Sequence, residues 1–209
     1  AIAGTRSPTR QGADNARAYG PPLTQAGLTV VWGLALGVDG AAHDGALQGA
    51  GSTVAVVGTG LDRVYPTRHA ELARRIAAEG LLISEYPIGM PPLAQNFPQR
   101  NRIIAGLARG TLVVEAALRS GSLITARLAS EGGRDVFAIP GSIHSPQSRG
   151  CHALIKQGAK LVEGAEDVLE ELQIDAPAMA QAQAPAPPSN GDPLLDALGF
   201  DPVSLDALV

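Results

Sequence analysis

The sequence TLVVEAALRSGSLITARLASE, residues 111–131, joins a short apolar run to a stretch of helical composition. Thr111–Val114 lacks the alternation of a half-buried strand, and such apolar runs are typical of parallel strands buried on both faces. Ser120-Gly121-Ser122 supplies a turn, and Leu123–Glu131 is predicted to be the helix that follows. A strand, a turn and a helix in this order form the repeating unit of an α/β protein.

The same unit recurs along the chain. Further strands are predicted at Ala1–Ala3 (the end of a first strand), Leu28–Val31, Thr53–Val57, Leu81–Ser84 and Val136–Ile139. Further helices are predicted at Gly40–Ala50, Arg68–Ala78 and Arg102–Ala108. This alternation predicts an α/β fold with a doubly wound, mostly parallel sheet. The segment after Gly4-Thr5-Arg6 is predicted to be a helix that ends near Tyr19 or kinks there, because Pro21-Pro22 interrupts it.

The domain organisation follows from length and composition. The chain has 209 residues, enough for one α/β domain, which we assign to residues 1–172. Residues 173–192 are rich in Ala and Pro and are predicted to be a flexible linker. Residues 193–209 are predicted to begin a small helical domain that is incomplete here, and the first strand is expected to start upstream of Ala1.

Cysteine content and charge narrow the class of protein. The single cysteine, Cys151, excludes a disulfide within the chain and a cysteine-based zinc cluster, so a reducing, cytoplasmic compartment is expected and no metal or cofactor. No apolar run approaches the ~20 residues of a membrane span, so no membrane partner is expected. The net charge is −4, but residues 1–150 carry 14 Lys and Arg against 10 Asp and Glu, whereas residues 151–209 carry 2 against 10. Positive charge is therefore concentrated in the first domain.

Common catalytic motifs are missing from the sequence. It contains no Gly-x-Ser-x-Gly, no Walker A sequence, no His-Glu-x-x-His and no Cys-x-x-Cys. Gly58-Thr59-Gly60 has Arg63 where a dinucleotide-binding loop needs its third glycine, so we interpret it as a tight turn. His144 and His152 lack a carboxylate and a nucleophile at a spacing that would complete a triad. We therefore predict no catalytic residues.

Two turns can bind an anion. Gly4, Thr5 and Arg6 follow the first strand and could offer backbone N–H groups, a hydroxyl and a guanidinium to a phosphate. Ser120, Gly121 and Ser122 open a helix, where unpaired N–H groups favour negative charge. An ordinary turn in the first case and simple helix capping in the second are the alternatives. Asp39, at the end of Gly33–Asp39, could cap the next helix, which is the simpler role, or orient the loop that carries Arg6.

Asn96–Ile104 carries the densest set of candidate ligand contacts. Arg100 and Arg102 lie two residues apart and point in different directions on a helix, so one could face a ligand while the other fixes the loop. Asn101 lies between them. Phe97 could stack on a nucleobase, since single-strand binders combine basic grooves with aromatic platforms. Core packing of Phe97 and solvation of the arginines are the alternatives.

Together these blocks resemble the DprA/Smf (DNA processing) family over most of residues 1–172. The resemblance is carried by Gly4-Thr5-Arg6, Gly33–Asp39, Gly58–Pro66, Ser84-Glu85, Asn96–Ile104, Glu115–Ala126, Pro140–Ile143, Gly150–His152 and Gly158–Val162. It implies an extended Rossmann-like fold without enzymatic activity. It also implies single-stranded DNA binding, a homodimer and the loading of RecA recombinase during natural transformation. Residues 193–209 would then begin the family's C-terminal winged-helix-like domain.

The resemblance also suggests site residues. The implied DNA-binding residues are Gly4, Thr5, Arg6, Phe97, Arg100, Asn101, Arg102, Ser120, Gly121 and Ser122. The implied dimer contact uses Leu154, Ile155, Leu161 and Val162. Leu36 and Trp32 depart from the family pattern, which usually has Arg and Ser there, so one basic contact could be lost.

Two other functions remain open at this stage. Rossmann-like nucleotide hydrolases that resemble the LOG phosphoribohydrolases also place a Glu after a strand, and Glu115 would then be catalytic. Their Pro-Gly-Gly-x-Gly-Thr loop is missing from this sequence. A module that only docks a protein partner is the third possibility, and it predicts no affinity for DNA.

Overall fold

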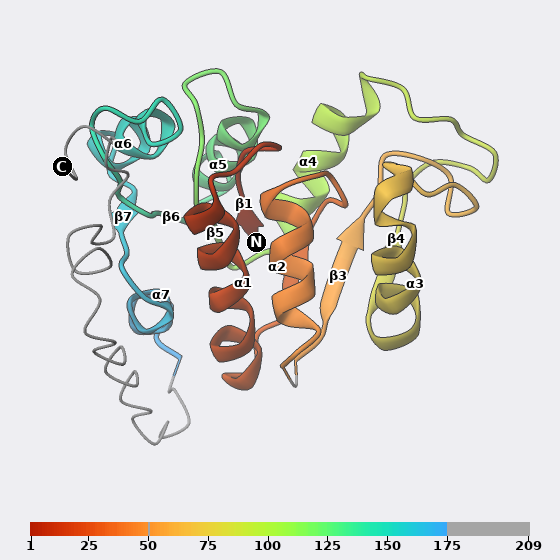
Figure 1. Ribbon diagram of the computed structural model, residues 1–209, viewed down its shortest axis with the longest axis horizontal. Coiled ribbons are helices and arrows are strands. Elements are labelled where there is room, and N and C mark those ends of the chain that lie inside the picture. Colours follow the sequence, from red (N-terminus) through yellow and green to blue (C-terminus); the bar gives the residue numbers. More distant parts are fainter. Residues whose placement is uncertain (50, 175–209) are drawn as a thin grey trace, which may run out of the picture. The chain divides into compact units, whose positions relative to one another are not determined.

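The alternation of strands and helices predicted from the sequence is confirmed by a computed structural model, which describes residues 1–49 and 51–174 (Figure 1). The strands are β1 (Ile2–Ala3), β2 (Val30–Trp32), β3 (Thr53–Val56), β4 (Leu81–Ile83), β5 (Gly110–Val113), β6 (Asp135–Ala138) and β7 (Lys160–Leu161). The helices are α1 (Arg10–Gln25), α2 (Val38–Ala46), the 3-10 turn η1 (Thr67–His69), α3 (Ala70–Glu79), α4 (Asn96–Leu107), α5 (Gly121–Glu131), α6 (Arg149–Lys156) and α7 (Ala165–Glu171).

Every strand pairing is parallel. One ladder has the order β1-β5-β6-β7 and the other has the order β2-β3-β4, with β2 lying beside β1. From β1 the chain builds outward through β2, β3 and β4, and then returns to β5 on the other side of β1. The two ladders thus form a doubly wound layer. Its topological switch point lies between β1 and β5, where ligands bind in folds of this kind.

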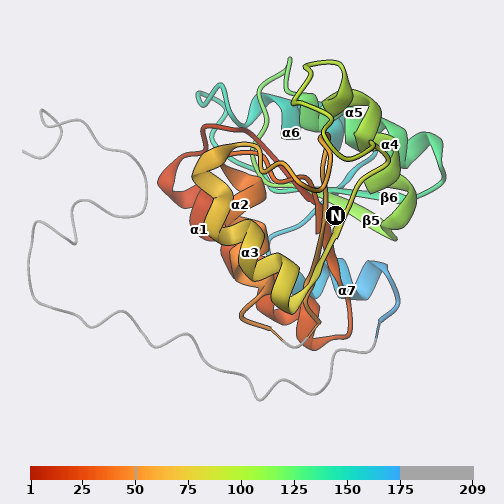
Figure 2. The same ribbon diagram turned by 90° about the vertical axis from the view of Figure 1, so that its right-hand side faces the viewer.

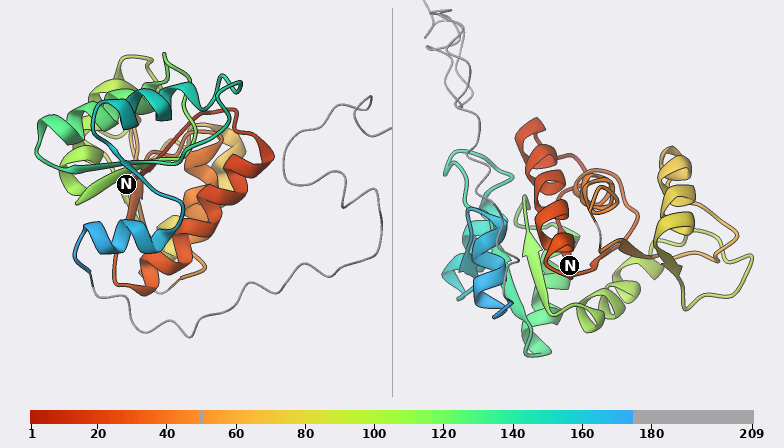
Figure 3. Two further views of the ribbon diagram at one scale, coloured as in Figure 1. Left: turned by 90° about the vertical axis from the view of Figure 1, so that its left-hand side faces the viewer. Right: turned by 90° about the horizontal axis from the view of Figure 1, so that it is seen from below.

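Helices cover both faces of the strands. Figure 2 and the left view of Figure 3 show α1, α2, α3 and α7 on one face and α4, α5 and α6 on the other. Most of the large, fully buried side chains are aliphatic, such as Ile2 and Leu112 under α1 and Val113 under α4 and α5, and Phe137 is the largest. This core fits the low aromatic content of 3%.

Helix α1 does not end near Tyr19, which was one of the two outcomes predicted for it. It continues through Pro21 and Pro22 to Gln25. A proline inside a helix leaves the carbonyl four residues earlier without its N–H partner, and for Pro21 that carbonyl belongs to Arg17. It lies against the backbone of Gly45 in α2. The close packing of α1 on α2 therefore outweighs the local cost of the two prolines.

Helix α4 begins earlier than predicted. It starts at Asn96, and Phe97 and Pro98 lie in its first turn. Proline is tolerated there because its missing N–H would have no helical partner at that position. Phe97, Arg100 and Asn101 therefore lie on one rigid element instead of a loop.

The predicted linker and C-terminal piece cannot be compared with the fold. Residues 175–209 lie outside the described residues. They include nearly all of the linker predicted at 173–192 and the whole of the C-terminal piece predicted at 193–209. Within the part of the chain that is described, no helix is long and apolar enough to cross a membrane.

Candidate nucleic-acid interface

The loop after β1 is fixed from two sides. The Thr5 N–H donates to the carbonyl of Glu115 after β5 at 2.7 Å, and the Val38 N–H at the start of α2 donates to the carbonyl of Thr5 at 3.2 Å. Gly37 approaches the backbone of Thr5 and Arg6 so closely that a Cβ would overlap it, and its φ of 85° favours glycine. These contacts leave the exposed side chain of Arg6 at the carboxyl edge of the strands.

A groove of about 520 Å³ opens at this edge. It brings together segments that are more than 100 residues apart in the sequence: the loop after β1, the first turns of α4 and the start of α5. All the predicted DNA-binding residues except Arg102 line it. They are Gly4, Thr5, Arg6, Phe97, Arg100, Asn101, Ser120, Gly121 and Ser122.

The start of α5 combines capping with an anion-binding geometry. Ser120 is the N-cap, its hydroxyl accepts from the Ser122 N–H, and the two hydroxyls lie 2.6 Å apart. Helix capping, the alternative to an anion site, is therefore present. It does not exclude the second role, because the first turn of a helix of 11 residues still points N–H groups and its positive dipole end into the groove.

Arg100 is buried at the back of the groove. Only 5% of it is exposed, its guanidinium donates to the carbonyl of Val56, and a Cβ at Gly33 would lie 2.6 Å from it. Burial lowers the pKa of Arg100, while the nearby carboxyl of Asp39 raises it. Arg100 is thus fixed in place and contributes positive potential from below the surface.

Asp39 lies under the same groove, and its predicted role as a cap of α2 is wrong. The N-cap is Gly37, no side chain caps it, and Asp39 lies in the first turn of the helix. Its carboxyl accepts from the Ala35 N–H at 3.1 Å and from the side chain of Trp32. Burial raises the pKa of Asp39 to about 6, and the positive charge of Arg100 opposes that rise. Trp32 is 4% exposed and supports the groove from beneath.

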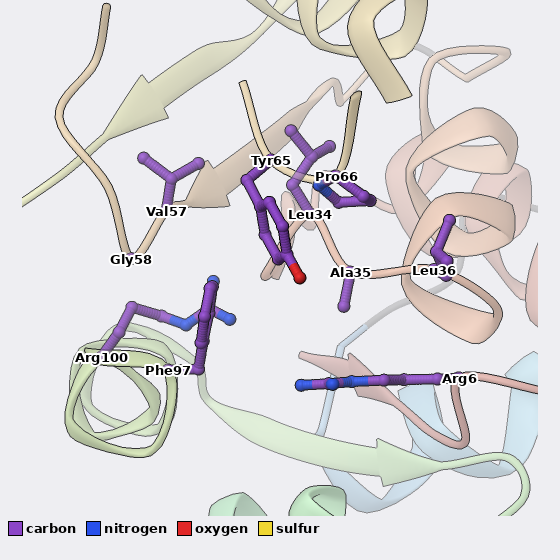
Figure 4. A pocket seen from close by; sticks show the side chains of 10 residues that line it. All are labelled: Arg6, Leu34, Ala35, Leu36, Val57, Gly58, Tyr65, Pro66, Phe97 and Arg100. Carbon is purple, nitrogen blue, oxygen red and sulfur yellow. The ribbon is translucent and has the colours of Figure 1, made fainter. Parts of the chain in front are cut away.

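A smaller aromatic pocket continues the groove beyond Arg6 (Figure 4). Phe97 and Tyr65 line it with their ring centroids 5.5 Å apart and their planes tilted by 35°. Arg6 and Arg100 line both the groove and this pocket. Phe97 is half-buried, so one part of its ring packs on the protein and another part faces the two cavities.

Arg102 and Glu115 lie outside the groove lining. The exposed side chain of Arg102 forms an ion pair with Glu85. Glu115 accepts hydrogen bonds from the backbone N–H of Thr9 at 2.9 Å and from its hydroxyl, so both carboxylate oxygens fix the start of α1. This geometry gives Glu115 a structural role.

The groove also contains residues that the sequence analysis missed. Arg119 and Gln147 line it, and Tyr65 lines the aromatic pocket. Arg119 directly precedes Ser120-Gly121-Ser122, so its place in that block was an available signal. Tyr65 and Gln147 lie in segments that looked like plain turns, and only the fold brings them to the edge.

The predicted dimer residues lie in different environments. Leu154 and Ile155 are half-buried and pack against the core, while Leu161 is 44% exposed on the edge strand β7. Val162 is fully buried. Its assignment to a subunit contact is wrong, because its side chain already packs within its own subunit.

The fold and the groove define a class of protein: a Rossmann-like α/β domain with a groove lined by arginines and a helix start, and an aromatic pocket, at the carboxyl edge of its strands. Within residues 1–49 and 51–174, no group of three His, Cys, Asp or Glu side chains is close enough to hold a metal ion.

Comparison with known proteins gives the family. The family model described as DNA recombination-mediator protein A matches residues 1–173. Protein Smf of Escherichia coli is 53% identical over 174 residues, which cover 83% of this chain and 46% of that protein. The chain belongs to the DprA/Smf family of DNA processing proteins.

Solved structures agree with this assignment. The X-ray structure of DNA processing protein A from Streptococcus pneumoniae is 51% identical with a TM-score of 0.77, covering 81% of this chain and 60% of that one. The DNA processing protein A of Helicobacter pylori, solved to explain its single-stranded DNA binding mode, is 31% identical with a TM-score of 0.76, covering 82% and 78%. The chain thus spans about half to two thirds of the length of the curated relatives named here and the pneumococcal structure.

Proposed function

We propose that this domain binds single-stranded DNA without catalysing a reaction. The observation that supports this most directly is one continuous surface. Arg6, Arg100 and Arg119 share the groove with the start of α5, and the aromatic pocket of Phe97 and Tyr65 adjoins it. Cationic grooves beside aromatic platforms suit a strand whose phosphates and base faces are both exposed.

Different residues are proposed to contact the phosphates and the bases of the DNA. Arg6 is exposed at the junction of groove and pocket and can meet a phosphate directly, while the buried Arg100 raises the potential behind it. Ser120, Gly121 and Ser122 offer hydroxyl and N–H donors. Because these groups address the backbone and the aromatic rings accept any base, little sequence preference is expected.

The family membership supports three further proposals. As a relative of DNA recombination-mediator protein A, the chain would help load RecA recombinase on single-stranded DNA in natural transformation, in the cytoplasm. It would do so as a homodimer, with Leu161 on the edge strand β7 as the most exposed of the predicted contact residues. Two grooves on one strand would raise affinity by avidity.

A titration of fluorescent oligo-dT at several salt concentrations tests the function. The logarithm of affinity should fall linearly with the logarithm of salt, with a slope of about −0.7 per neutralised phosphate. Arg6→Ala should weaken binding and make this slope shallower by about 0.7, the amount expected for the loss of one phosphate contact. Arg74→Ala, on the outer side of α3 in an exposed pair with Glu71, is the matched control and should change neither.

Two results would contradict the proposal. Equal affinity of Arg6→Ala and the unmodified chain would mean that the groove is not the binding site. Complete lack of binding at low salt would favour a module that only docks a protein partner.

A further inference from the structure

Two neighbouring loops expose aliphatic side chains beside the aromatic pocket. The loop between β3 and η1 carries Leu61 and Val64, and the loop between β4 and α4 carries Ile88 and Leu93. Their exposed fractions are 48%, 39%, 72% and 39%. We call these four residues the apolar rim. None of them lines the groove or the aromatic pocket, so the contacts proposed above leave them unused.

Hydrogen bonds between the two loops fix the rim in place. The Gly60 N–H donates to the carbonyl of Met90 at 3.0 Å, and the Gly89 N–H donates to the carboxylate of Asp62 at 2.8 Å. The Ser84 hydroxyl donates to the carbonyl of Thr59 at 2.6 Å. Figure 1 shows both loops at the same end of the strands. Because each loop fixes the other, the aliphatic side chains are presented outward on a rigid support.

The rim continues the proposed binding surface. Along the carboxyl edge, the strand ends follow the order β5, β1, β2, β3 and β4. The serines of α5 follow β5, Arg6 follows β1, and Tyr65 of the aromatic pocket follows β3. Tyr65 and Val64 are adjacent in the same loop. The surface thus changes from cationic at β5 and β1 to aromatic at β3 and then to aliphatic beyond it.

We propose that the apolar rim contacts the bases of nucleotides that adjoin those bound in the groove. The proposal rests on the proposed function, single-stranded DNA binding. A strand lying along this edge passes over Arg6 and the aromatic pocket and meets the rim next. Base faces are apolar and unpaired in a single strand, so contact with Leu61 and Ile88 removes apolar surface from water on both sides. The four rim side chains offer a phosphate no donor, although the exposed Arg63, between Leu61 and Val64, can contact one beside the rim.

The proposal is tested by changing the protein and the DNA together. The DNA probes are oligo-dT of about twelve nucleotides, within the usual span of single-strand sites, and an abasic strand with the same number of phosphates. The protein variant is Leu61→Ser with Ile88→Ser in the full chain. Both side chains are exposed, so the fold should tolerate the change, which thermal unfolding would verify. Leu107→Ser, 55% exposed at the other end of α4, is the matched control.

The expected result is a loss that depends on the bases. The double variant should bind oligo-dT roughly three- to tenfold more weakly, from the apolar area it no longer covers. It should bind the abasic strand as the unmodified chain does, and its salt slope should not change because no phosphate contact is lost. Leu107→Ser should behave as the unmodified chain on both probes.

Three outcomes would overturn the proposal. Equal losses on oligo-dT and the abasic strand would mean that the substitutions disturb the groove. An unchanged affinity for both would mean that the rim contacts no base and is available to a protein partner. If the unmodified chain itself bound neither probe, the proposed function would fail as well, and that result is distinct from the other two.

Discussion

At the scale of single residues, two buried titratable groups lie one helical turn apart under the groove. Asp39 and His43 both belong to α2 and are 4% and 0% exposed. Burial raises the pKa of Asp39 to about 6 and lowers the pKa of His43 to about 4. The imidazole of His43 forms hydrogen bonds with the hydroxyl of Thr53 at 2.7 Å and with the carbonyl of Gly33. Gly33 in turn lies against the guanidinium of Arg100. Burial therefore favours the neutral form of each group.

The two groups act on stability in opposite directions. The folded state binds the proton of Asp39 more tightly than the unfolded state, so its contribution falls as the pH rises from about 4 to about 6. The unfolded state binds the proton of His43 more tightly, so that contribution is lost as the pH falls from about 6.5 to about 4. Over most of this window the two effects oppose each other.

Asp39→Asn should expose this balance. The amide keeps an acceptor for the Ala35 N–H and does not titrate. We subtract the free energy of unfolding of the unmodified chain from that of the variant. This difference should rise by about 3 kcal/mol as the pH increases from about 4 to about 7. Urea unfolding at several pH values measures the difference. A difference that stays constant or falls with pH would show that burial does not raise the pKa of Asp39.

Glu115→Gln separates a structural role from a catalytic one. Both carboxylate oxygens accept from Thr9, so the amide loses one acceptor and the free energy of unfolding should drop by about 1–2 kcal/mol. Neither form should release free base from a nucleoside monophosphate. Base release by the unmodified chain that the substitution abolishes would instead support a nucleotide hydrolase.

At the scale of elements, the packing of α1 on α2 opposes local helix preference. Alanine is a better helix former than glycine by about 1 kcal/mol. At Gly45 of α2, however, a Cβ would overlap the carbonyl of Arg17. Gly106 in α4 has no neighbour within 4 Å of its Cβ position. Replacing Gly106 by Ala therefore tests helix propensity alone, whereas the same change at Gly45 also tests the packing of α1 on α2.

Gly45→Ala and Gly106→Ala should have opposite effects on stability. Gly45→Ala should lower the free energy of unfolding by about 1–3 kcal/mol, because two packed backbones would have to move apart. Gly106→Ala should raise it by about 0.5–1 kcal/mol. Thermal unfolding of both variants checks the signs. Stabilisation by Gly45→Ala would mean that α1 and α2 can separate without cost.

The same elements show what could be predicted from sequence. Six of the seven described strands were predicted because an apolar run of strand length ended in a turn, and parallel pairing followed from the intervening helices. Strand β7 was missed because it has only two residues, Lys160–Leu161, and one of them is charged. The convergence of Arg6, Phe97 and Ser120 was predictable too, since carboxyl ends of parallel strands share one edge. The path of α1 through Pro21 depends on α2, and the Arg102–Glu85 pair depends on side-chain conformations, so neither is encoded locally.

At the scale of the whole molecule, charge is unevenly distributed. The groove carries three arginines, yet the net charge of the chain is −4. Residues 175–209 contribute five Asp and no Lys, Arg or Glu. Exposed charges act over roughly 10 Å at about 0.1 M salt and farther at lower salt. The C-terminal residues therefore lower the average potential that a DNA strand meets on approach.

Replacing Asp175, Asp192, Asp196, Asp201 and Asp206 with Asn should strengthen DNA binding at low salt. The net charge changes from −4 to +1, and none of the described residues is replaced. Affinity for oligo-dT should rise about two- to fivefold near 0.01 M salt, where the screening length is about 30 Å, and the gain should vanish near 1 M. The gain should persist in Leu107→Ser, which leaves the groove intact, and shrink in Arg6→Ala. A gain of equal size at every salt concentration would point to direct occlusion of the groove instead of long-range repulsion.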